Sequence, residues 1–243
     1  MALVLVTGAS TGLGLATATA LAADGHDVVL HARNAGRLDD PGVLERMHDV
    51  VYGDLAQLDA TVQVARQADA IGPFDAVVHN AGVMRSRDTL AVNTVAPFVL
   101  TATMTAPGRS IVLSSGMHRS GSPQRLEADF ADPGRTSYED SKLFVTALAL
   151  ALARRRPQTL THVVDPGWVP TRMGGPSAPD DLEDGHRTQV WLATADAESL
   201  EPRSGGYWYH RVARAPHPAA ADVTFQEAVV SALEARTGIA LPN

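Results

Sequence analysis

The chain has 243 residues, 45% of them hydrophobic and 19% charged, which is typical of one globular domain with a large core. Its net charge of −7, with no block of like charges, argues against binding to nucleic acid. The absence of cysteine excludes disulfides and thiolate metal sites, and its nine histidines show no ligand spacing, so we predict no metal. The apolar start, Met1 to Val6, is too short to span a membrane, so we expect no membrane span and a cytoplasmic protein.

The first predicted strand, Leu3 to Thr7, is a continuous apolar run of the kind that a parallel sheet buries on both faces. A glycine-rich loop follows it, and a helix is predicted from about Leu13 to Ala23. Glycines let a backbone approach a pyrophosphate closely, and the free N–H groups and dipole of a helix N-terminus favour its charge. We therefore interpret this loop as a dinucleotide-binding loop, the alternative being a tight turn used only for packing.

The second predicted strand runs from Asp27 to Ala32 and is followed by Arg33. In folds of this type, an acidic residue at the end of this strand binds the ribose 2′-hydroxyl of NAD, whereas an arginine accommodates the 2′-phosphate of NADP. Ala32 stands where the acid would be, and the planar guanidinium of Arg33 suits a phosphate. The sequence thus favours NADP(H) over NAD(H), unless Arg33 is only an exposed turn residue.

Strands and helices alternate along the rest of the chain. We predict strands over 49–52, 74–79, 109–113, 159–164 and 206–211, and helices over 57–70, 88–105, 138–154, 186–195 and 221–236. At most a short helix is expected in 34–48, and Pro97 predicts a kink or a late helix start. This pattern is typical of an α/β fold: one Rossmann-like domain over 1–243, with a doubly wound parallel sheet of about seven strands and helices on both faces. Glycine, proline and aspartate are frequent in 174–185, and we expect a flap over the substrate site within 172–190.

Tyr138 and Lys142 stand four residues apart at the start of a predicted helix, so both side chains lie on one face. A fixed cation favours phenolate over phenol. Lowering the pKa of a tyrosine from about 10 to about 7 takes about 4 kcal/mol, which a lysine and an oxidised nicotinamide can supply together. The pair then predicts a proton donor and acceptor for neutral pH, although such a pair is more often ordinary helix surface.

In their order, the motifs of the chain resemble those of the short-chain dehydrogenase/reductase superfamily over essentially the whole length. They are Thr7-Gly8-x-x-x-Gly12-x-Gly14, Asp54, Asn80-Ala81-Gly82, Asn93, Ser115, Tyr138-x-x-x-Lys142, and Pro166-Gly167 with Thr171. Within the superfamily, the chain looks most like the retinol-dehydrogenase and protochlorophyllide-reductase branch. The segments that indicate this branch are Ala32-Arg33-Asn34, Ser114-Ser115-x-x-His118-Arg119, Tyr138-x-x-Ser141-Lys142-Leu143 and Ser204-Gly205-Gly206-Tyr207.

The resemblance implies a role for each matching residue. Tyr138 would be the general acid in reduction and the base in oxidation, and Ser115 would hydrogen-bond the substrate carbonyl oxygen. Lys142 would hold the nicotinamide ribose and lower the pKa of Tyr138, and Asn93 would hold a water of the proton relay. The implied cofactor-binding residues are Gly8, Ser10, Thr11, Gly12, Leu13, Gly14, Arg33, Asp54, Leu55, Asn80, Ala81, Gly82, Tyr138, Lys142, Pro166, Gly167, Val169 and Thr171. We expect Ser114 to be a packing residue and His118 not to be the base.

The leading hypothesis is an NADP(H)-dependent oxidoreductase that interconverts a small carbonyl compound, an aldehyde or ketone, and its alcohol. The alternatives are a catalytically weak dinucleotide-binding regulator or scaffold on the same fold, and an epimerase or dehydratase that keeps its cofactor bound. The segments 83–92 and 96–108 are shorter than is usual in the superfamily, where the second contributes to a dimer interface. A monomer and a homodimer therefore both stay open.

Overall fold

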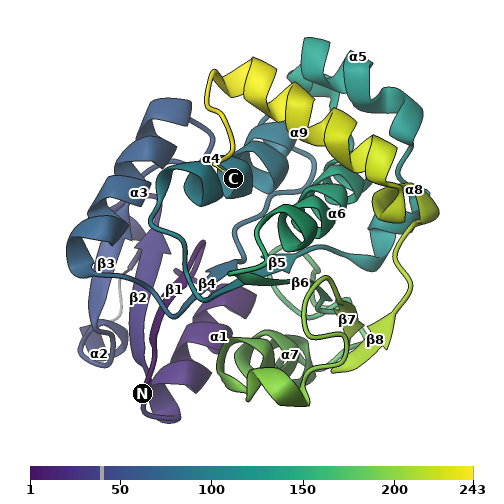
Figure 1. Cartoon of the computed structure of the whole chain (residues 1–243). Coiled ribbons are helices and arrows are strands. Elements are labelled where there is room, and N and C mark those ends of the chain that lie inside the picture. The colour runs from purple at the N-terminus through teal and green to yellow at the C-terminus, as the bar shows by residue number, and fades with distance from the viewer. Residues whose placement is uncertain (39–40, 243) are drawn as a thin grey trace.

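The computed structural model describes residues 1–38 and 41–242, and its centre is an eight-stranded sheet (Figure 1). The sheet order is β3-β2-β1-β4-β5-β6-β7-β8, and every neighbouring pair is parallel except β7 and β8. The strands are β1 (Leu3–Val6), β2 (Asp27–Ala32), β3 (Asp49–Tyr52), β4 (Ala76–His79), β5 (Arg109–Leu113), β6 (Leu160–Asp165), β7 (Tyr207–Tyr209) and β8 (Val212–Arg214). This order, which reverses direction at β1 and β4, confirms the doubly wound α/β fold.

Helices cover both faces of the sheet. In Figure 1, α1 (Gly12–Ala23) and α7 (Leu182–Thr194) lie below it, whereas α3 (Leu58–Ile71), α4 (Ala96–Thr103) and α6 (Tyr138–Arg155) lie above it. The outer helix α9 (Val223–Thr237) packs on α6, near α5 (Leu126–Ala131) and α8 (Pro218–Ala221), and the short α2 (Pro41–Leu44) precedes β3. In the described ranges, no helix is both long and apolar enough to cross a membrane.

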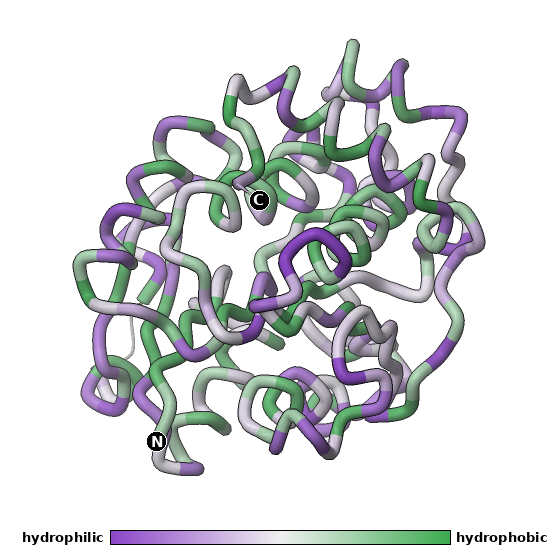
Figure 2. Tube along the Cα trace, viewed as in Figure 1, coloured by the Kyte–Doolittle hydropathy of each residue, from purple (hydrophilic) through white to green (hydrophobic). Residues whose placement is uncertain are grey.

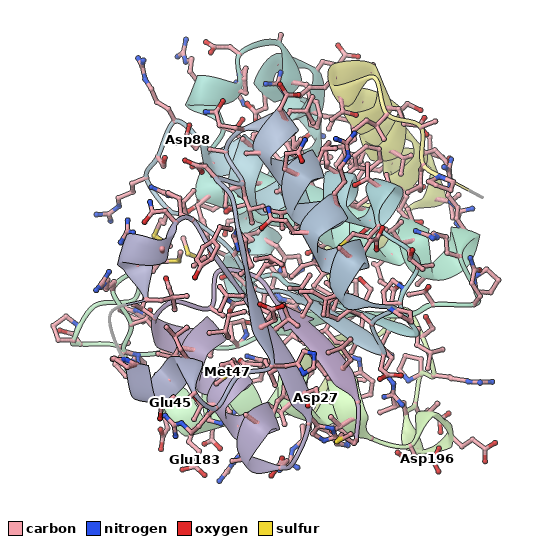
Figure 3. The ribbon with its side chains drawn as sticks, turned by 90° about the vertical axis from the view of Figure 1, so that its left-hand side faces the viewer. Asp27, Glu45, Met47, Asp88, Glu183 and Asp196 are labelled. Carbon is pink, nitrogen blue, oxygen red and sulfur yellow. The ribbon has the colours of Figure 1, made fainter. Side chains whose placement is uncertain are left out.

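Successive side chains of a strand point to opposite faces of the sheet and so fill a hydrophobic layer on each face. In β1, Val4 and Val6 belong to the cluster that includes Leu21 of α1 and Leu192 of α7, whereas Leu5 joins the cluster on the side of α3 and α4. Figure 2 shows the hydrophobic colour concentrated along the central strands and the inner sides of the helices. Charged side chains such as Asp88, Glu183 and Asp196 point outward at the rim of the molecule (Figure 3). The continuous apolar strands of the sequence are thus buried on both faces.

Two side chains hold the loop that follows β1, one from β2 and one from the residue after β4, the two strands on either side of β1. The Gly8 amide donates to Nδ1 of His31 at 3.0 Å, so Nε2 of that ring carries the proton and donates to the Gly53 carbonyl, 2.9 Å away. From the other side, Nδ2 of Asn80 donates to the carbonyls of Thr7 and Gly8 at 2.8 and 3.3 Å. The loop is therefore held from the β2 side by the buried His31 and from the β4 side by the partly buried Asn80.

The end of the sheet differs from its prediction. The strand predicted over 206–211 is a hairpin of β7 and β8, whose turn contains His210 at φ 49° and Arg211 at φ 61°. Two successive positive φ angles suit the tight turn between antiparallel strands, but such turns usually carry glycine or asparagine. Neither residue stands here, so no residue type marked the turn, and the sheet has eight strands where about seven were expected.

Three helical segments also differ from the prediction. The helix expected over 88–105 runs over 89–103 and contains a π-helical turn, Ala91–Val95, ahead of α4, which carries Pro97 in its first turn; the helix does not start late, and the π-helical turn accommodates the proline instead. Helix α7 begins at Leu182 because the Asp181 side chain caps its N-terminus, so residues 182–190 of the expected flap are helical. Helix α5 was not predicted, and in 34–48 only a short turn and α2 are helical, with residues 39–40 outside the described part.

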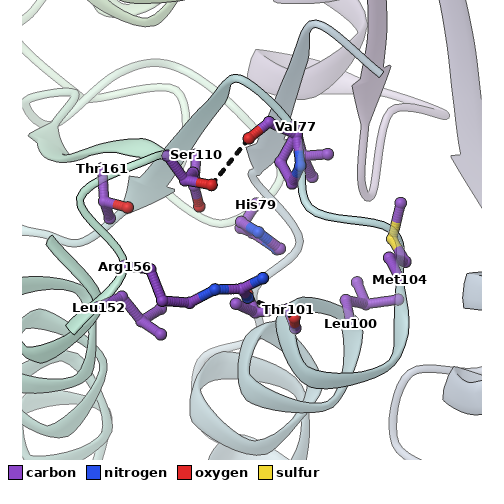
Figure 4. A pocket seen from close by; sticks show the side chains of 11 residues that line it. Val77, His79, Leu100, Thr101, Met104, Ser110, Leu152, Arg156 and Thr161 are labelled. Atoms are coloured by element: carbon purple, nitrogen blue, oxygen red, sulfur yellow. Dashed lines mark hydrogen bonds between the residues drawn. The ribbon is translucent and has the colours of Figure 1, made fainter. Parts of the chain in front are cut away.

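Two buried histidines make the sheet sensitive to acid. His79 in β4 and His162 in β6 are 4% and 1% exposed, and burial lowers the pKa of each from 6.5 to about 4. Figure 4 shows His79 beside Arg156 in a hollow of about 10 Å³, room for no more than about one water molecule. Protonation of His79 would therefore place a second cation next to a buried guanidinium.

We predict that acidification unfolds the protein through these groups. Between pH 6.5 and about 4 the unfolded state binds protons that the folded state does not. As the pH is lowered through this range, the free energy of unfolding decreases by up to about 3 kcal/mol for each histidine. Urea denaturation at about pH 7 and about pH 4.5 measures this loss. His79→Gln should lose less stability than the wild type, and His48→Gln, at an exposed position, should lose as much. An equal loss in all three proteins would contradict the prediction.

The glycine loop provides a second prediction, from a matched pair of variants. Gly8 and Gly25 both have positive φ, at 64° and 83°. A Cβ at Gly8 would lie 2.8 Å from Cα of Ala81, whereas one at Gly25 would meet nothing within 4 Å. Gly25→Ala should lose about 1 kcal/mol of stability from backbone strain alone, and Gly8→Ala about 1–3 kcal/mol more. Chemical denaturation tests this, and equal losses would show that the loop yields to a methyl group.

Candidate functional site

A cleft of about 1310 Å³ lies at the carboxyl ends of the strands, where open α/β sheets bind their ligands. All eighteen residues expected to bind a cofactor line this cleft, and so does Ser115. Asn93 is the one expected site residue that does not line it. The structure thus brings together residues from the loops after β1 to β6, which lie far apart in the sequence.

The start of α6 places Tyr138 and Lys142 in the cleft. Ser137 caps the helix by accepting a hydrogen bond from the Asp140 amide at 3.0 Å, so Tyr138 is the first helical residue. Nζ of Lys142 lies 5.6 Å from the centre of the Tyr138 ring and donates to the Leu113 carbonyl at 2.7 Å. The two side chains meet as their spacing predicts, with the ammonium over the ring face.

Burial dominates the electrostatics of this pair. It raises the pKa of Tyr138 to about 12; a hydrogen bond with Ser115 opposes the rise, while the charges of Asp165 and Glu139 add to it. Burial likewise lowers the pKa of Lys142 to about 8. In the protein alone, burial sets the direction of the Tyr138 pKa, and a lowering by Lys142 together with an oxidised nicotinamide stays a prediction. At neutral pH Tyr138 is a phenol, which is a proton donor.

His118 supports Ser115 from behind, a role that sequence analysis missed. Its Nε2 accepts a hydrogen bond from the His217 amide at 2.9 Å, so Nδ1 carries the proton and donates to the Ser115 carbonyl, 2.7 Å away. The ring is fully buried and does not line the cleft. The neighbouring Ser114 forms a buried hydrogen bond of 2.7 Å with Thr146, as expected of a packing residue.

Asn93 lies behind the cleft in the π-helical turn and ties three segments together. Its Oδ1 accepts from the Val83 amide at 2.8 Å, and its Nδ2 donates to the Val83 carbonyl at 3.0 Å and to Oγ of Ser141 at 2.9 Å. The side-chain amide is thus occupied by protein groups. Pro97 has no N–H, so the Asn93 carbonyl lacks its usual α-helical partner.

The other half of the cleft suits an extended anionic ligand. A Cβ on Gly14 would lie 2.3 Å from Nδ2 of Asn80, and one on Gly12 3.3 Å from Cγ2 of Thr171. Gly12 and Gly14 line the cleft at the start of α1, where the N–H groups of a helix N-terminus suit a phosphate. At the rim, Nε of Arg33 lies 3.6 Å from Oδ2 of Asp54, and both side chains are substantially exposed. These residues fit a dinucleotide.

Two more polar residues at the site had no signal in the sequence. His31, which fastens Gly8, is a lone histidine at a strand end, and Asp165 is a lone acid before Pro166. Contacts to residues far along the chain define both roles, so no local spacing could reveal them. Within 1–38 and 41–242, no cluster of three or more metal-ligating side chains is present.

Comparison with known proteins agrees with this geometry. The short chain dehydrogenase family model matches residues 2–182. The chain is 36% identical to "Short-chain dehydrogenase chry4" of Gibberella zeae over 100% of both chains, and 30% identical to bovine "Dehydrogenase/reductase SDR family member 13" over 90% of this chain and 68% of that protein. A short chain dehydrogenase from Burkholderia cenocepacia, solved in complex with NADP, matches with a TM-score of 0.69 and 24% identity, over 85% of this chain and 94% of that one. With its sheet, cleft and motifs in place, this protein belongs to the short-chain dehydrogenase/reductase family of oxidoreductases.

Proposed function

We propose that the chain is an NADP(H)-dependent oxidoreductase that interconverts an aldehyde or ketone and its alcohol, with Tyr138 as general acid in reduction and base in oxidation. One observation carries the proposal: a single cleft holds Arg33 near one end and Ser115, Tyr138 and Lys142 at the other. Arg33 follows β2 and Ser115 follows β5, with β1 and β4 between them, which separates the two groups by about 14 Å. An extended dinucleotide spans such a distance.

The residues of the chain act on the carbonyl oxygen. A bound nicotinamide cofactor supplies the hydride that reduces the carbonyl carbon. Tyr138 donates its proton to the oxygen, and the Ser115 hydroxyl donates a hydrogen bond that stabilises the developing negative charge. Lys142 would hold the ribose, and the Asn93 carbonyl, which has no i+4 amide partner because of Pro97, would accept a hydrogen bond from a relay water. Oxidation uses the same groups in reverse.

The preference for NADP(H) rests on charge at the end of β2. Arg33 and Arg37 line this part of the cleft, and Ala32 replaces the acid that would bind an NAD ribose. The NADP complex of the Burkholderia relative supports this proposal. The substrate that we propose is a small carbonyl compound or alcohol in the cytoplasm, covered by residues 172–181 ahead of α7; a monomer and a homodimer both stay open.

Loss of the Tyr138 hydroxyl should abolish turnover. NADPH absorbance decay is followed over a panel of aldehydes, ketones, quinones and conjugated enones, with NADH run in parallel. Tyr138→Phe should lower kcat/KM at least about a hundredfold, because it removes the proton donor, whereas Tyr52→Phe, in β3 and not among the residues that line the cleft, should not. Full turnover by Tyr138→Phe would refute the proposal. NADPH binding without any turnover would favour the regulator, and cofactor that co-purifies without net redox change would favour the epimerase or dehydratase.

Arg33→Ala should weaken NADPH binding by about tenfold to a hundredfold and leave NADH binding unchanged, because only NADPH carries the 2′-phosphate. Fluorescence titration of the bound reduced cofactor measures both affinities without any substrate. Arg66→Ala, at an exposed position of α3 outside the cleft, is the control and should leave both unchanged. Equal weakening of the two cofactors by Arg33→Ala would contradict a contact with the 2′-phosphate.

A further inference from the structure

Three large apolar side chains that water can reach gather in the cleft. Met117, Trp168 and Met173 are 41%, 57% and 41% exposed, and all three line the cleft. In the described ranges, the large apolar residues that are exposed outside the cleft are Met1, Leu58, Val212 and Val223. Exposed apolar side chains that gather in a concave site are typically covered by a ligand, so these three indicate an apolar ligand.

These side chains lie at the same end of the cleft as Ser115. Met117 follows β5, and its amide donates to Oγ of Ser115 at 3.2 Å. The other two follow β6, which pairs with β5. A Cβ on Gly116 would lie only 3.1 Å from Oδ2 of Asp165, which the Tyr207 hydroxyl holds at 3.0 Å, so the turns after the two strands touch. A substrate whose carbonyl oxygen lies at Ser115 therefore has these apolar side chains within reach.

The Trp168 indole is fixed in place although it is exposed. Its ring N–H donates to the Gly174 carbonyl at 2.8 Å. Its backbone amide donates to Oδ2 of Asp180 at 2.6 Å, and its carbonyl accepts from the Asp180 amide at 3.1 Å. The two ends of segment 168–180 are thus joined, and the indole is bonded to the middle of this closed loop. Such a ring offers a flat apolar face that loses little conformational entropy when a ligand binds.

We propose that the substrate carries an aromatic ring, which packs against the Trp168 indole and the thioethers of Met117 and Met173. The proposal rests on the function proposed above and names its substrate class, an aryl-bearing ketone or aldehyde and the corresponding alcohol. Aromatic rings pack on one another in offset or edge-to-face arrangements, and methionine sulfur makes favourable contacts with ring edges. An aliphatic group of equal size gains the hydrophobic effect of the same surfaces but neither of these contacts.

A pair of ketones with matched reactivity tests the proposal. Benzylacetone and its cyclohexyl analogue are the same methyl ketone, and two methylene groups separate the carbonyl from the ring that differs. An apolar cleft without aromatic recognition would favour the cyclohexyl ketone, which is the more hydrophobic of the two. We expect kcat/KM with NADPH to be about threefold to tenfold higher for benzylacetone. A ratio at or below one in the wild type would overturn the proposal.

Variants locate the preference on the named side chains. Trp168→Leu keeps an apolar group but removes the aromatic face, so it should lower the ratio of the two kcat/KM values about twofold to fivefold and leave NADPH affinity close to wild type. Met117→Leu, which removes the sulfur at similar volume, is a second variant in case Trp168→Leu does not fold, and should lower the ratio in the same direction. Leu58→Ala, at an exposed position of α3 outside the cleft, is the control and should leave the ratio unchanged.

Two outcomes with these variants would overturn the proposal. One is an unchanged ratio in the folded variants. The other is a loss of NADPH affinity in Trp168→Leu as large as its loss of benzylacetone turnover, because the cofactor rather than the substrate would then cover the indole.

A binding measurement separates this proposal from the oxidoreductase function. The chain has three tryptophans, and the fluorescence of Trp168 is the difference between the wild type and Trp168→Leu. With oxidised NADP bound, the alcohol of benzylacetone should change this fluorescence at a lower concentration than its cyclohexyl analogue does. If the aryl alcohol binds preferentially but neither ketone is reduced, the oxidoreductase function fails and aromatic recognition stands. If both ketones are reduced equally well, the function stands and aromatic recognition is overturned.

Discussion

Burial of α6 on two sides is the constraint on which the catalytic half of the cleft depends. Val145 and Ala149 pack against the sheet beside Val112 and Val163, whereas Phe144 and Leu148 belong to the cluster that α9 completes. A helix packed on two sides cannot turn or slide without opening both contacts. Hydrogen bonds of the same helix to Asn93 and Ser114 fix its register further. The positions of Tyr138 and Lys142 are thus set by hydrophobic packing along the first three or so turns of the same helix.

The burial of this helix also raises the free energy of charged groups in the site. Water is largely excluded from Lys142, which is 3% exposed, so its charged form is disfavoured and its contact with the Leu113 carbonyl is strengthened. The same exclusion disfavours the phenolate of Tyr138. In such surroundings a fixed dipole or charge acts strongly on a developing oxyanion. The exclusion of water that stabilises the packed fold therefore also makes Tyr138 sensitive to nearby charges and dipoles.

Short-range sequence patterns predicted the main strands and helices and most of the cleft residues. Apolar runs closed by glycine or polar residues predicted the central strands, and motif order predicted which residues meet in the cleft. The turn at His210 and Arg211 was missed because neither residue type marks positive φ, and α5 because its six residues have no clear period. The roles of His31 and Asp165 depend on partners far along the chain. The burial that raises the pKa of Tyr138 in the protein alone was not predicted, because residue spacing contains no information about depth of burial.

The hydrogen bonds of His31 and Asn80 to the loop after β1 have a consequence for the thermodynamics of ligand binding. Because these side chains fix the Gly8 backbone in the folded protein, the conformational entropy of the loop is lost when the chain folds rather than when a ligand arrives. A ligand therefore meets a rigid surface, and its binding free energy is not reduced by ordering that loop. A substitution that removes the hydrogen bonds of His31 or Asn80 to the loop would then make the binding entropy less favourable, even with every ligand contact intact.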